Sequence, residues 1–285
     1  MKHDLHQDDN PPSRYVVGID LGTTNSAVAY VDTHQEPWRV ETFALPQLVA
    51  PGQIEPRPAL PSFHLQALTS EKESGTWRIP FAEHDGSYAV GVFARDQGAR
   101  IPGRLVASAK SWLCHSGVDR TADILPWQGD ADAGRLSPVA VAARYLAHIR
   151  DAWDHAFPAE PLAEQQLVVT LPASFDEVAR ELTVRAASDA QLPRIVLIEE
   201  PQAAFYSWVY RHADHWEDLV HDGQLILVCD IGGGTADFTL IRVGAGAAAG
   251  AESARQPASF HRVAVGNHLI LGGDNLDLAL AHHVA

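Results

Sequence analysis

The chain has 285 residues, 46% of them hydrophobic, and its 36 acidic against 21 basic residues give a formal net charge of −15. This length is sufficient for a large core and for two domains. Such an acidic chain is not expected to bind nucleic acid, because a phosphate backbone requires a basic face. No apolar run approaches 18 residues, so the composition also argues against a membrane span.

The start of the chain and its cysteines indicate the cellular compartment. Residues 1–13 are polar and contain no apolar core, which predicts a disordered leader rather than a signal peptide. The two cysteines, Cys114 and Cys229, lie far apart and in no metal-binding spacing. This usage predicts a reducing, cytoplasmic location without a disulfide framework. Cys229 falls within an apolar run, where a buried thiol is expected.

Residues 17–31, VGIDLGTTNSAVAYV, predict two apolar strands joined by a tight turn. Asp20 stands near the end of the first strand. The turn itself is built from small and polar residues, namely Gly22, Thr23, Thr24 and Asn25. Glycine lets backbone N–H groups approach an anion closely, and a carboxylate beside phosphate oxygens suits a hydrated Mg²⁺ between them.

The region from about 44 to 135 predicts a small inserted subdomain. Residues 45–61 contain five prolines, so we expect an extended surface loop without regular structure. Short strands are expected at 63–68, 76–81 and 88–92. The segment AKSWL at 109–113 contains Lys110, one of only three lysines in the chain. By itself it fits a surface helix as well as a functional site.

A βαβ unit is predicted in the second third of the chain. Residues 138–157 should form a helix capped by Ser137, with one apolar stripe at helical spacing. A strand at 167–171, a helix at 175–191 with a capping box of Ser174 and Glu177, and a parallel strand at 195–198 should follow.

Glu199 and Glu200 end the last of these strands. Open α/β sheets bind ligands at the carboxyl ends of their parallel strands, so Glu200 is a candidate site residue. A second role, in capping the helix predicted at 202–210, is equally open and compatible with the first.

Residues 225–238, LILVCDIGGGTADF, predict a strand buried on both faces, a glycine-rich loop and a second strand that continues to 243. Asp230 and Asp237 flank the loop. Its residues are Gly232, Gly233, Gly234 and Thr235. Asp20 and Gly22 recur as Asp230 and Gly232 at a common offset of 210 positions, which predicts two similar halves that point their loops at one cleft.

Composition and short motifs predict the structure of the remaining segments. Residues 211–223 are polar and predict a connecting loop, and the GAGAAAG stretch at 244–250 predicts a flexible hairpin connection. A strand is expected at 260–265. The sequence LGGDNLD at 271–277 should begin a final helix whose leucines form an exposed apolar patch, Leu276, Leu278 and Leu280.

Together these motifs resemble the N-terminal nucleotide-binding domain of the 70-kilodalton heat-shock (DnaK-type) chaperone family. The resemblance extends from about residue 15 to the last residue, although Glu199 and Leu276 depart from the family pattern. It implies an α/β fold of the actin-like ATPase type, a duplicated ribonuclease H-like arrangement with two lobes. Residues 14–212 would form the first lobe, and residues 213–285 a second lobe that is incomplete at its C-terminal end.

The resemblance also implies slow hydrolysis of ATP to ADP with Mg²⁺, as a nucleotide switch. Asp20 and Asp230 would hold Mg²⁺ through its waters. The implied catalytic residues are Lys110, Glu200, Asp237 and Asp230. The implied nucleotide-binding residues are Gly22, Thr23, Thr24, Asn25, Gly232, Gly233, Gly234, Thr235, Gly272 and Gly273. Client polypeptides and co-chaperones would bind through regions outside this chain.

Two other classes share the same loops. A sugar kinase of this superfamily would need a base carboxylate beside a sugar pocket, and a non-hydrolysing actin-like scaffold would assemble into filaments. Lys110 and the Glu200-Pro201 turn favour the chaperone-type ATPase over both.

Overall fold

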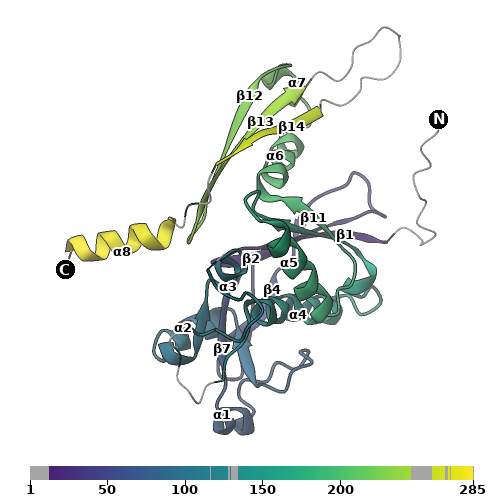
Figure 1. Ribbon diagram of the computed structural model, residues 1–285. Coiled ribbons are helices and arrows are strands. Elements are labelled where there is room, and N and C mark those ends of the chain that lie inside the picture. The colour runs from purple at the N-terminus through teal and green to yellow at the C-terminus, as the bar shows by residue number, and fades with distance from the viewer. Residues whose placement is uncertain are drawn as a thin grey trace.

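A computed structural model describes residues 13–115, 117–127, 129, 134–244, 259–266, 269 and 271–284. The chain is of the mixed α/β class and contains several sheets (Figure 1). Nearly all of the predicted leader, and residues 245–250 of the glycine–alanine stretch, lie outside the described residues. Among the described helices, none has both the length and the apolar character needed to cross a membrane.

The central sheet has six strands in the order β11-β10-β1-β2-β3, and β6 pairs with β2. β1, β10 and β11 are parallel, as the βαβ prediction requires, whereas β2 runs antiparallel to β1. The strands are β1 Tyr15–Leu21, β2 Asn25–Asp32, β3 Glu41–Thr42, β6 Leu60–Pro61, β10 Gln166–Leu171 and β11 Ile195–Glu199.

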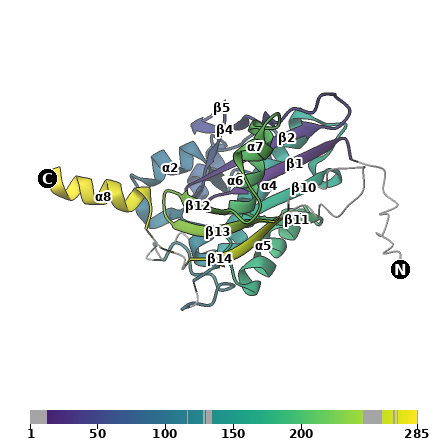
Figure 2. The ribbon, with the colours of Figure 1, turned by 90° about the horizontal axis from the view of Figure 1, so that it is seen from above.

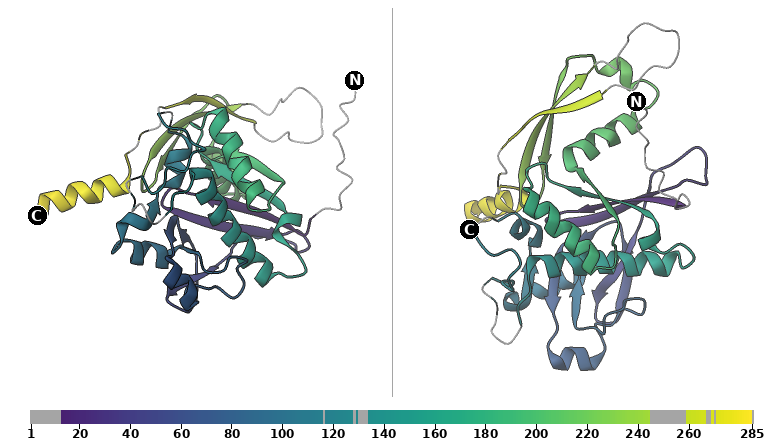
Figure 3. Two further views of the ribbon diagram at one scale, coloured as in Figure 1. Left: turned by 60° about the horizontal axis from the view of Figure 1, so that its bottom comes forward. Right: turned by 45° about the vertical axis from the view of Figure 1, so that its right-hand side comes forward.

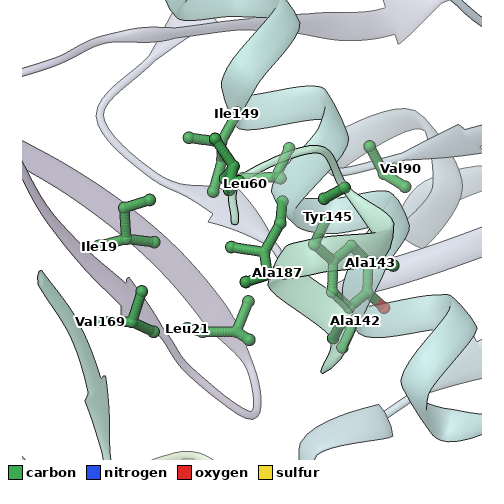
Figure 4. Close-up of a cluster of buried hydrophobic side chains, with 14 of the residues drawn as sticks. Ile19, Leu21, Leu60, Val90, Ala142, Ala143, Tyr145, Ile149, Val169 and Ala187 are labelled. Atoms are coloured by element: carbon green, nitrogen blue, oxygen red, sulfur yellow. The ribbon is translucent and has the colours of Figure 1, made fainter. Parts of the chain in front are cut away.

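Two helices, α4 Pro138–Ala156 and α5 Glu177–Asp189, cover one face of this sheet. Alternation along β1 buries Val17, Ile19 and Leu21 against them and turns Asp20 to the other face. Figure 4 shows Ile19 and Val169 from the sheet facing Ile149 of α4. This core fixes the position of β1 and therefore of the turn that follows it.

The caps of these helices confirm one prediction and correct another. The Ser137 hydroxyl accepts a hydrogen bond from the Ala140 amide at 3.1 Å and caps α4, as expected. For α5 the capping residue is Asp176, which accepts from the Ala179 amide, and not Ser174. Ser174 lies two residues earlier, where its hydroxyl donates to Asp237.

Residues 45–107 contain more regular structure than the sequence predicted. Two antiparallel strands, β4 Leu45–Ala50 and β5 Gln53–Arg57, occupy the proline-rich stretch that was expected to be an irregular loop. Pro46 lies opposite Pro56, and a two-stranded ribbon leaves each strand an edge where a missing N–H breaks no ladder bond.

The rest of this region forms a second small sheet in the order β8-β7-β9. Its strands are β7 Phe63–Gln66, β8 Tyr88–Val90 and β9 Leu105–Ala107. The strand expected at 76–81 is absent from the described residues, and Trp77 and Ile79 instead pack into a local core from turns. Short helices complete it: α1 Thr69–Ser74, α2 Val92–Gly98, the 3₁₀ turn Pro102–Arg104 and α3 Ala109–Leu113.

A three-stranded antiparallel sheet lies over the other face of the central sheet (Figures 1 and 2). Its strands are β12 Leu225–Ile231, β13 Ala236–Gly244 and β14 Ser259–Val265. α6 Glu200–Arg211 connects the two sheets and packs against β12. The predicted polar loop before β12 contains a short helix, α7 Trp216–Leu219. Elsewhere in the chain, a 3₁₀ turn, Leu162–Glu164, precedes β10.

The prediction that β12 is buried on both faces is wrong. Its side chains alternate between half-buried and exposed, and Cys229 is exposed rather than enclosed. α6 covers one face of β12, whereas Leu227 and Ile231 point to solvent. An apolar strand is buried on both faces only where other elements pack on both faces, and the strand's own sequence does not reveal them.

The last helix, α8 Gly273–Val284, projects away from the rest of the chain (Figures 1 and 3). No side chain described on it is buried, and Leu276, Leu278 and Leu280 are each more than half exposed. The predicted exposed apolar patch at this end is confirmed.

These contrasting environments predict different responses to leucine truncation. Leu146 of α4 is fully buried, so Leu146→Ala should lower the free energy of unfolding by about 2–5 kcal/mol through the cavity it leaves. Leu278→Ala, the control on α8, should change it by about 0.5 kcal/mol or less, because Leu278 is 57% exposed. Urea unfolding measures both. Equal losses in the two variants would contradict the described burial.

Candidate functional site

The two hairpins predicted from the repeat have matching registers. Asp20 lies opposite Ala27 across β1 and β2, and Asp230 lies opposite Asp237 across β12 and β13. Both aspartates therefore precede their turns by the same distance on the ladder. The internal repeat seen in the sequence is thus a repeat of local structure.

The turns of the two hairpins meet. Thr24 of the first turn contacts Gly233 of the second, and Thr23 lies against Gly234. A Cβ at position 233 would overlap the Thr24 side chain, so this approach requires glycine. In Figure 1 the end of the β12–β13 hairpin reaches down beside β2 and α3.

A cleft of about 1010 Å³ opens beside the two turns, between the central sheet and α6. Most of the predicted site residues line it, namely Asp20, Gly22, Thr23, Thr24, Asn25, Lys110, Glu200, Asp230, Gly232, Gly233 and Thr235. Its far end is formed by Val40, Tyr206 and Tyr210, which the sequence did not indicate. The structure therefore brings together side chains that are up to 215 positions apart in the sequence.

One ion pair crosses the floor of the cleft. Lys110, on α3, is only 9% exposed and its ammonium pairs with the Glu200 carboxylate at the start of α6. Ser108 precedes α3 with φ of 55°, a left-handed conformation that turns the chain sharply from β9 toward the cleft. Glu200 is the first residue of α6, and the N-cap residue before it, Glu199, makes no side-chain capping hydrogen bond. Of the two open roles of Glu200, the structure shows the contact in the cleft.

Negative charge accumulates around this pair. Burial raises the pKa of Glu200, Lys110 opposes that shift, and the carboxylates of Asp20 and Asp230 reinforce it. Burial also raises the pKa of Asp230, again reinforced by Asp20 and opposed by Lys110. Three carboxylates thus face one lysine at this end of the cleft, so negative charge exceeds positive charge there, and the carboxylates repel one another.

This donor set fits a magnesium ion bound through water. Carboxylate oxygens are the ligands that Mg²⁺ prefers, and Mg²⁺ keeps several of its own waters. Across the described residues, no three His, Cys, Asp or Glu side chains converge closely enough to ligate a metal directly. Asp20 and Asp230 on opposite sides of the cleft are therefore suited to a hydrated ion rather than to a bare one.

Some predicted site residues lie behind the cleft rather than in its lining. Asp237 is buried, and its carboxylate accepts a hydrogen bond from Ser174 at 3.0 Å, which links the second hairpin to the end of β10. Gly273 donates its N–H to the Gly232 carbonyl at 3.0 Å, and Asp274 donates to the Gly233 carbonyl at 2.7 Å. A Cβ on Gly272 would overlap both carbonyls, so glycine is required there to hold the turn.

Two polar side chains that support the first turn were not predicted. Thr170 of β10 donates its hydroxyl to the Asp20 carboxylate at 2.8 Å from the neighbouring strand. A single polar residue in the apolar run of β10 is the signal that could have found it. Ser62 donates to the Gly22 carbonyl at 2.7 Å, although no local sequence pattern connects these residues.

A separate charge cluster at the end of β11 joins the central sheet to the three-stranded sheet. Glu199 accepts hydrogen bonds from Arg180 of α5 and from Arg262 of β14. From the sequence, Glu199 was notable only because it departs from the family pattern. The structure shows that this carboxylate is a shared acceptor for arginines from the middle and last thirds of the chain.

The fold and cleft define a class of protein: an α/β chain in which two β-hairpins on separate sheets bring glycine turns and carboxylates to one site. The Hsp70 protein family profile matches residues 95–285, and the chain belongs to this family. The heat-shock family inferred from the sequence is therefore confirmed.

Individual relatives agree with this assignment. Chaperone protein HscA of Enterobacter sp. (strain 638) is 31% identical over 280 residues, covering 95% of this chain and 38% of its own length. HscA of Serratia proteamaculans (strain 568) is 32% identical over 281 residues, covering 94% and 37%. The HscA homolog of Bordetella pertussis is 30% identical over 285 residues, covering 95% and 37%. The chain thus spans under two fifths of the length of these relatives.

The crowded carboxylates predict a stabilising substitution. The pKa of Asp230 is raised in the folded chain, so the folded state holds this proton more tightly than the unfolded state. The protonated carboxyl therefore adds to the free energy of unfolding below the ordinary carboxyl pKa, and this stabilisation is lost as the pH rises through the raised pKa. At pH 7 without Mg²⁺ or nucleotide, Asp230→Asn should therefore raise Tm by roughly 1–3 °C. The gain should shrink as the pH falls toward 4.

Differential scanning calorimetry across this pH range measures the effect, with Glu181→Gln on the exposed side of α5 as the control. The control should leave Tm unchanged at each pH. A lower Tm for Asp230→Asn at pH 7 would show that repulsion in the cleft is not the dominant effect.

Proposed function

We propose that this chain forms the ATP-binding and slowly ATP-hydrolysing switch region of an Hsp70-type chaperone. Its two hairpin-bearing sheets would be the cores of two actin-like lobes, residues 14–212 with the inserted region at 44–135, and residues 213–285. The observation that carries the proposal is the meeting of the two glycine turns beside a cleft that contains Lys110, Glu200, Asp20 and Asp230.

The turns supply the phosphate contacts. Backbone N–H groups and the hydroxyls of Thr23, Thr24 and Thr235 are donors on the cleft wall and suit phosphate oxygens. Asp20 and Asp230 would orient the waters of a bound Mg²⁺, which supplies charge neutralisation to the phosphates when bound. The acidic cleft thus binds an anionic nucleotide only together with its cation.

Lys110 is placed to act on the transferred phosphoryl group. Its ammonium is held in the cleft by Glu200 and is largely shielded from solvent, which strengthens its interaction with developing negative charge. Glu200 fixes the ammonium position and, through its raised pKa, is suited to share a proton with an attacking water. Asp237 would assist from behind the second turn by holding it in place.

The relatives bear the name chaperone, and we extend that role to this chain. Nucleotide exchange and hydrolysis would change how the lobes close and so regulate binding of client polypeptides and co-chaperones through other regions. The protein would act in the cytoplasm, as its two widely separated cysteines suggest. Phosphate transfer to a sugar, or filament assembly with ATP, would instead support the kinase or scaffold alternatives.

Isothermal titration tests the proposed binding directly. The chain should bind ADP in the presence of Mg²⁺ and lose at least tenfold in affinity when EDTA removes the ion, because the carboxylates would then repel the phosphates. Asp20→Asn should reduce the dependence on Mg²⁺, whereas Asp85→Asn, on the remote surface near Lys72, should not. Equal binding with and without Mg²⁺ would argue against this site.

Lys110→Ala tests the proposed catalytic role. Removing one preorganised charged donor should lower the single-turnover rate of ATP hydrolysis by about 10²–10³, while ATP affinity stays nearly constant. Lys72→Ala removes a lysine whose only described ion pair is with the exposed Asp85, and should leave the rate unchanged. If Lys110→Ala hydrolyses bound ATP at the parent rate, Lys110 has no part in the chemistry.

A further inference from the structure

Ser62 is a buried residue that contacts the first glycine turn through both its backbone and its side chain. It lies between β6 and β7 and is 2% exposed. Its hydroxyl donates to the Gly22 carbonyl at 2.7 Å, and its backbone N–H donates to the Thr24 carbonyl at 2.8 Å. Two carbonyls of the turn between β1 and β2 are thus held by one residue that lies about 40 positions further along the chain.

The bond to the Gly22 carbonyl also decides the direction of the hydrogen bond between Ser62 and Ser26. Ser26 Oγ lies 3.1 Å from Ser62 Oγ, and both side chains are buried. A hydroxyl has one proton, and that of Ser62 points to the Gly22 carbonyl, so Ser26 must be the donor in the bond between the two serines. Ser26 therefore orients Ser62, and Ser62 orients the turn.

Holding these carbonyls determines where the next amides point. In a planar trans peptide the C=O of one residue and the N–H of the next point in opposite directions. The Gly22 carbonyl is turned inward to Ser62, so the Thr23 N–H is turned outward on the cleft side. The bond from Ser62 N–H to Thr24 fixes the plane between Thr24 and Asn25 in the same way.

Two carbonyls of the second turn are also held by hydrogen bonds, but there both donors are backbone N–H groups. There the carbonyls of Gly232 and Gly233 accept hydrogen bonds from the backbone N–H groups of Gly273 and Asp274, at the start of α8. The N–H groups of Gly233 and Gly234 are thereby turned away from α8. Among the described residues, no helix donates to the first turn in this way, and Ser62 takes that place.

Ser62 also directly precedes β7, whose partner strand β9 leads into the segment that contains Lys110. β7 begins at Phe63, and Phe63 pairs with Ala107 of β9. Ser108 and the first residues of α3 follow at once and bring Lys110 into the cleft. The residue that orients the first turn is therefore joined, through one strand pair, to the segment that carries the lysine.

We propose that Ser62 is a positioning residue that fixes the peptide planes of the first glycine turn so that its N–H groups face the phosphates. The proposal rests on the proposed nucleotide function for its consequence and on the described hydrogen bonds for its structural part. Ser62 does not contact the ligand itself. It acts through the turn.

NMR relaxation of the nucleotide-free protein tests the structural part. In the parent, the amide order parameters of Thr23 and Asn25, whose N–H groups lie in the two held peptide planes, should be close to the rigid value of about 0.85. In Ser62→Ala they should fall toward about 0.6, with the larger fall at Thr23, because the variant loses the hydroxyl bond to Gly22 and keeps the backbone bond to Thr24. Ser62→Cys, which keeps the volume but has only a weak donor, should change them in the same direction. Ser137→Ala removes the hydroxyl that caps α4, lowers Tm and should leave both order parameters unchanged.

Titration with MgADP tests the consequence. Ser62→Ala should bind about five- to tenfold more weakly than the parent, and Ser137→Ala should bind like the parent. A parent that does not bind MgADP would refute the proposed function, while the order parameters would still decide the role of Ser62. Unchanged order parameters in both Ser62 variants, or an equal fall in Ser137→Ala, would overturn the proposal.

Discussion

The contact between Thr24 and Gly233 is the constraint on which the site depends. It joins turns from two different sheets, and it is possible because position 233 has no Cβ. Each turn directly follows a strand that carries an aspartate, so bringing the turns together also brings Asp20 and Asp230 to one cleft. The close approach thereby concentrates negative charge in one place.

That charge opposes folding, and it would favour the binding of a cation. Burial and mutual repulsion raise the pKa of Asp230 and Glu200, which means that their ionised forms are disfavoured in the folded chain. The opposing stability comes from elsewhere, chiefly from the core between the central sheet and α4, where Ile19, Leu146 and Ile149 are buried. A rigid core can hold a strained charge arrangement, which the proposed Mg²⁺ and nucleotide would relieve together.

Much of the fold and site followed from the sequence because it is encoded locally. The hairpins, the cap at Ser137 and the parallel strands around α5 each depend on residues near one another in the chain. The role of Lys110 at the phosphates was inferred from family resemblance and stays a prediction, while the structure shows its ammonium in the cleft beside Glu200.

The errors concern features decided by distant parts of the chain. Pro46 and Pro56 are accommodated because they face each other on a two-stranded ribbon, which depends on pairing and not on composition. Cys229 is exposed because an apolar strand is buried only by what packs on it. Gly272 matched a motif, yet it serves from behind the second turn, and Ser62 has no motif at all.

A crystal structure of the chain with Mg²⁺ and ADP is the most direct test of the central claim that both turns serve one ligand. We predict that the phosphates lie between the two glycine turns. The ion should be roughly 4 Å from a carboxylate oxygen of Asp20 and of Asp230, with its waters between. A nucleotide bound elsewhere, or one that contacts a single turn with its ion away from either aspartate, would contradict the account.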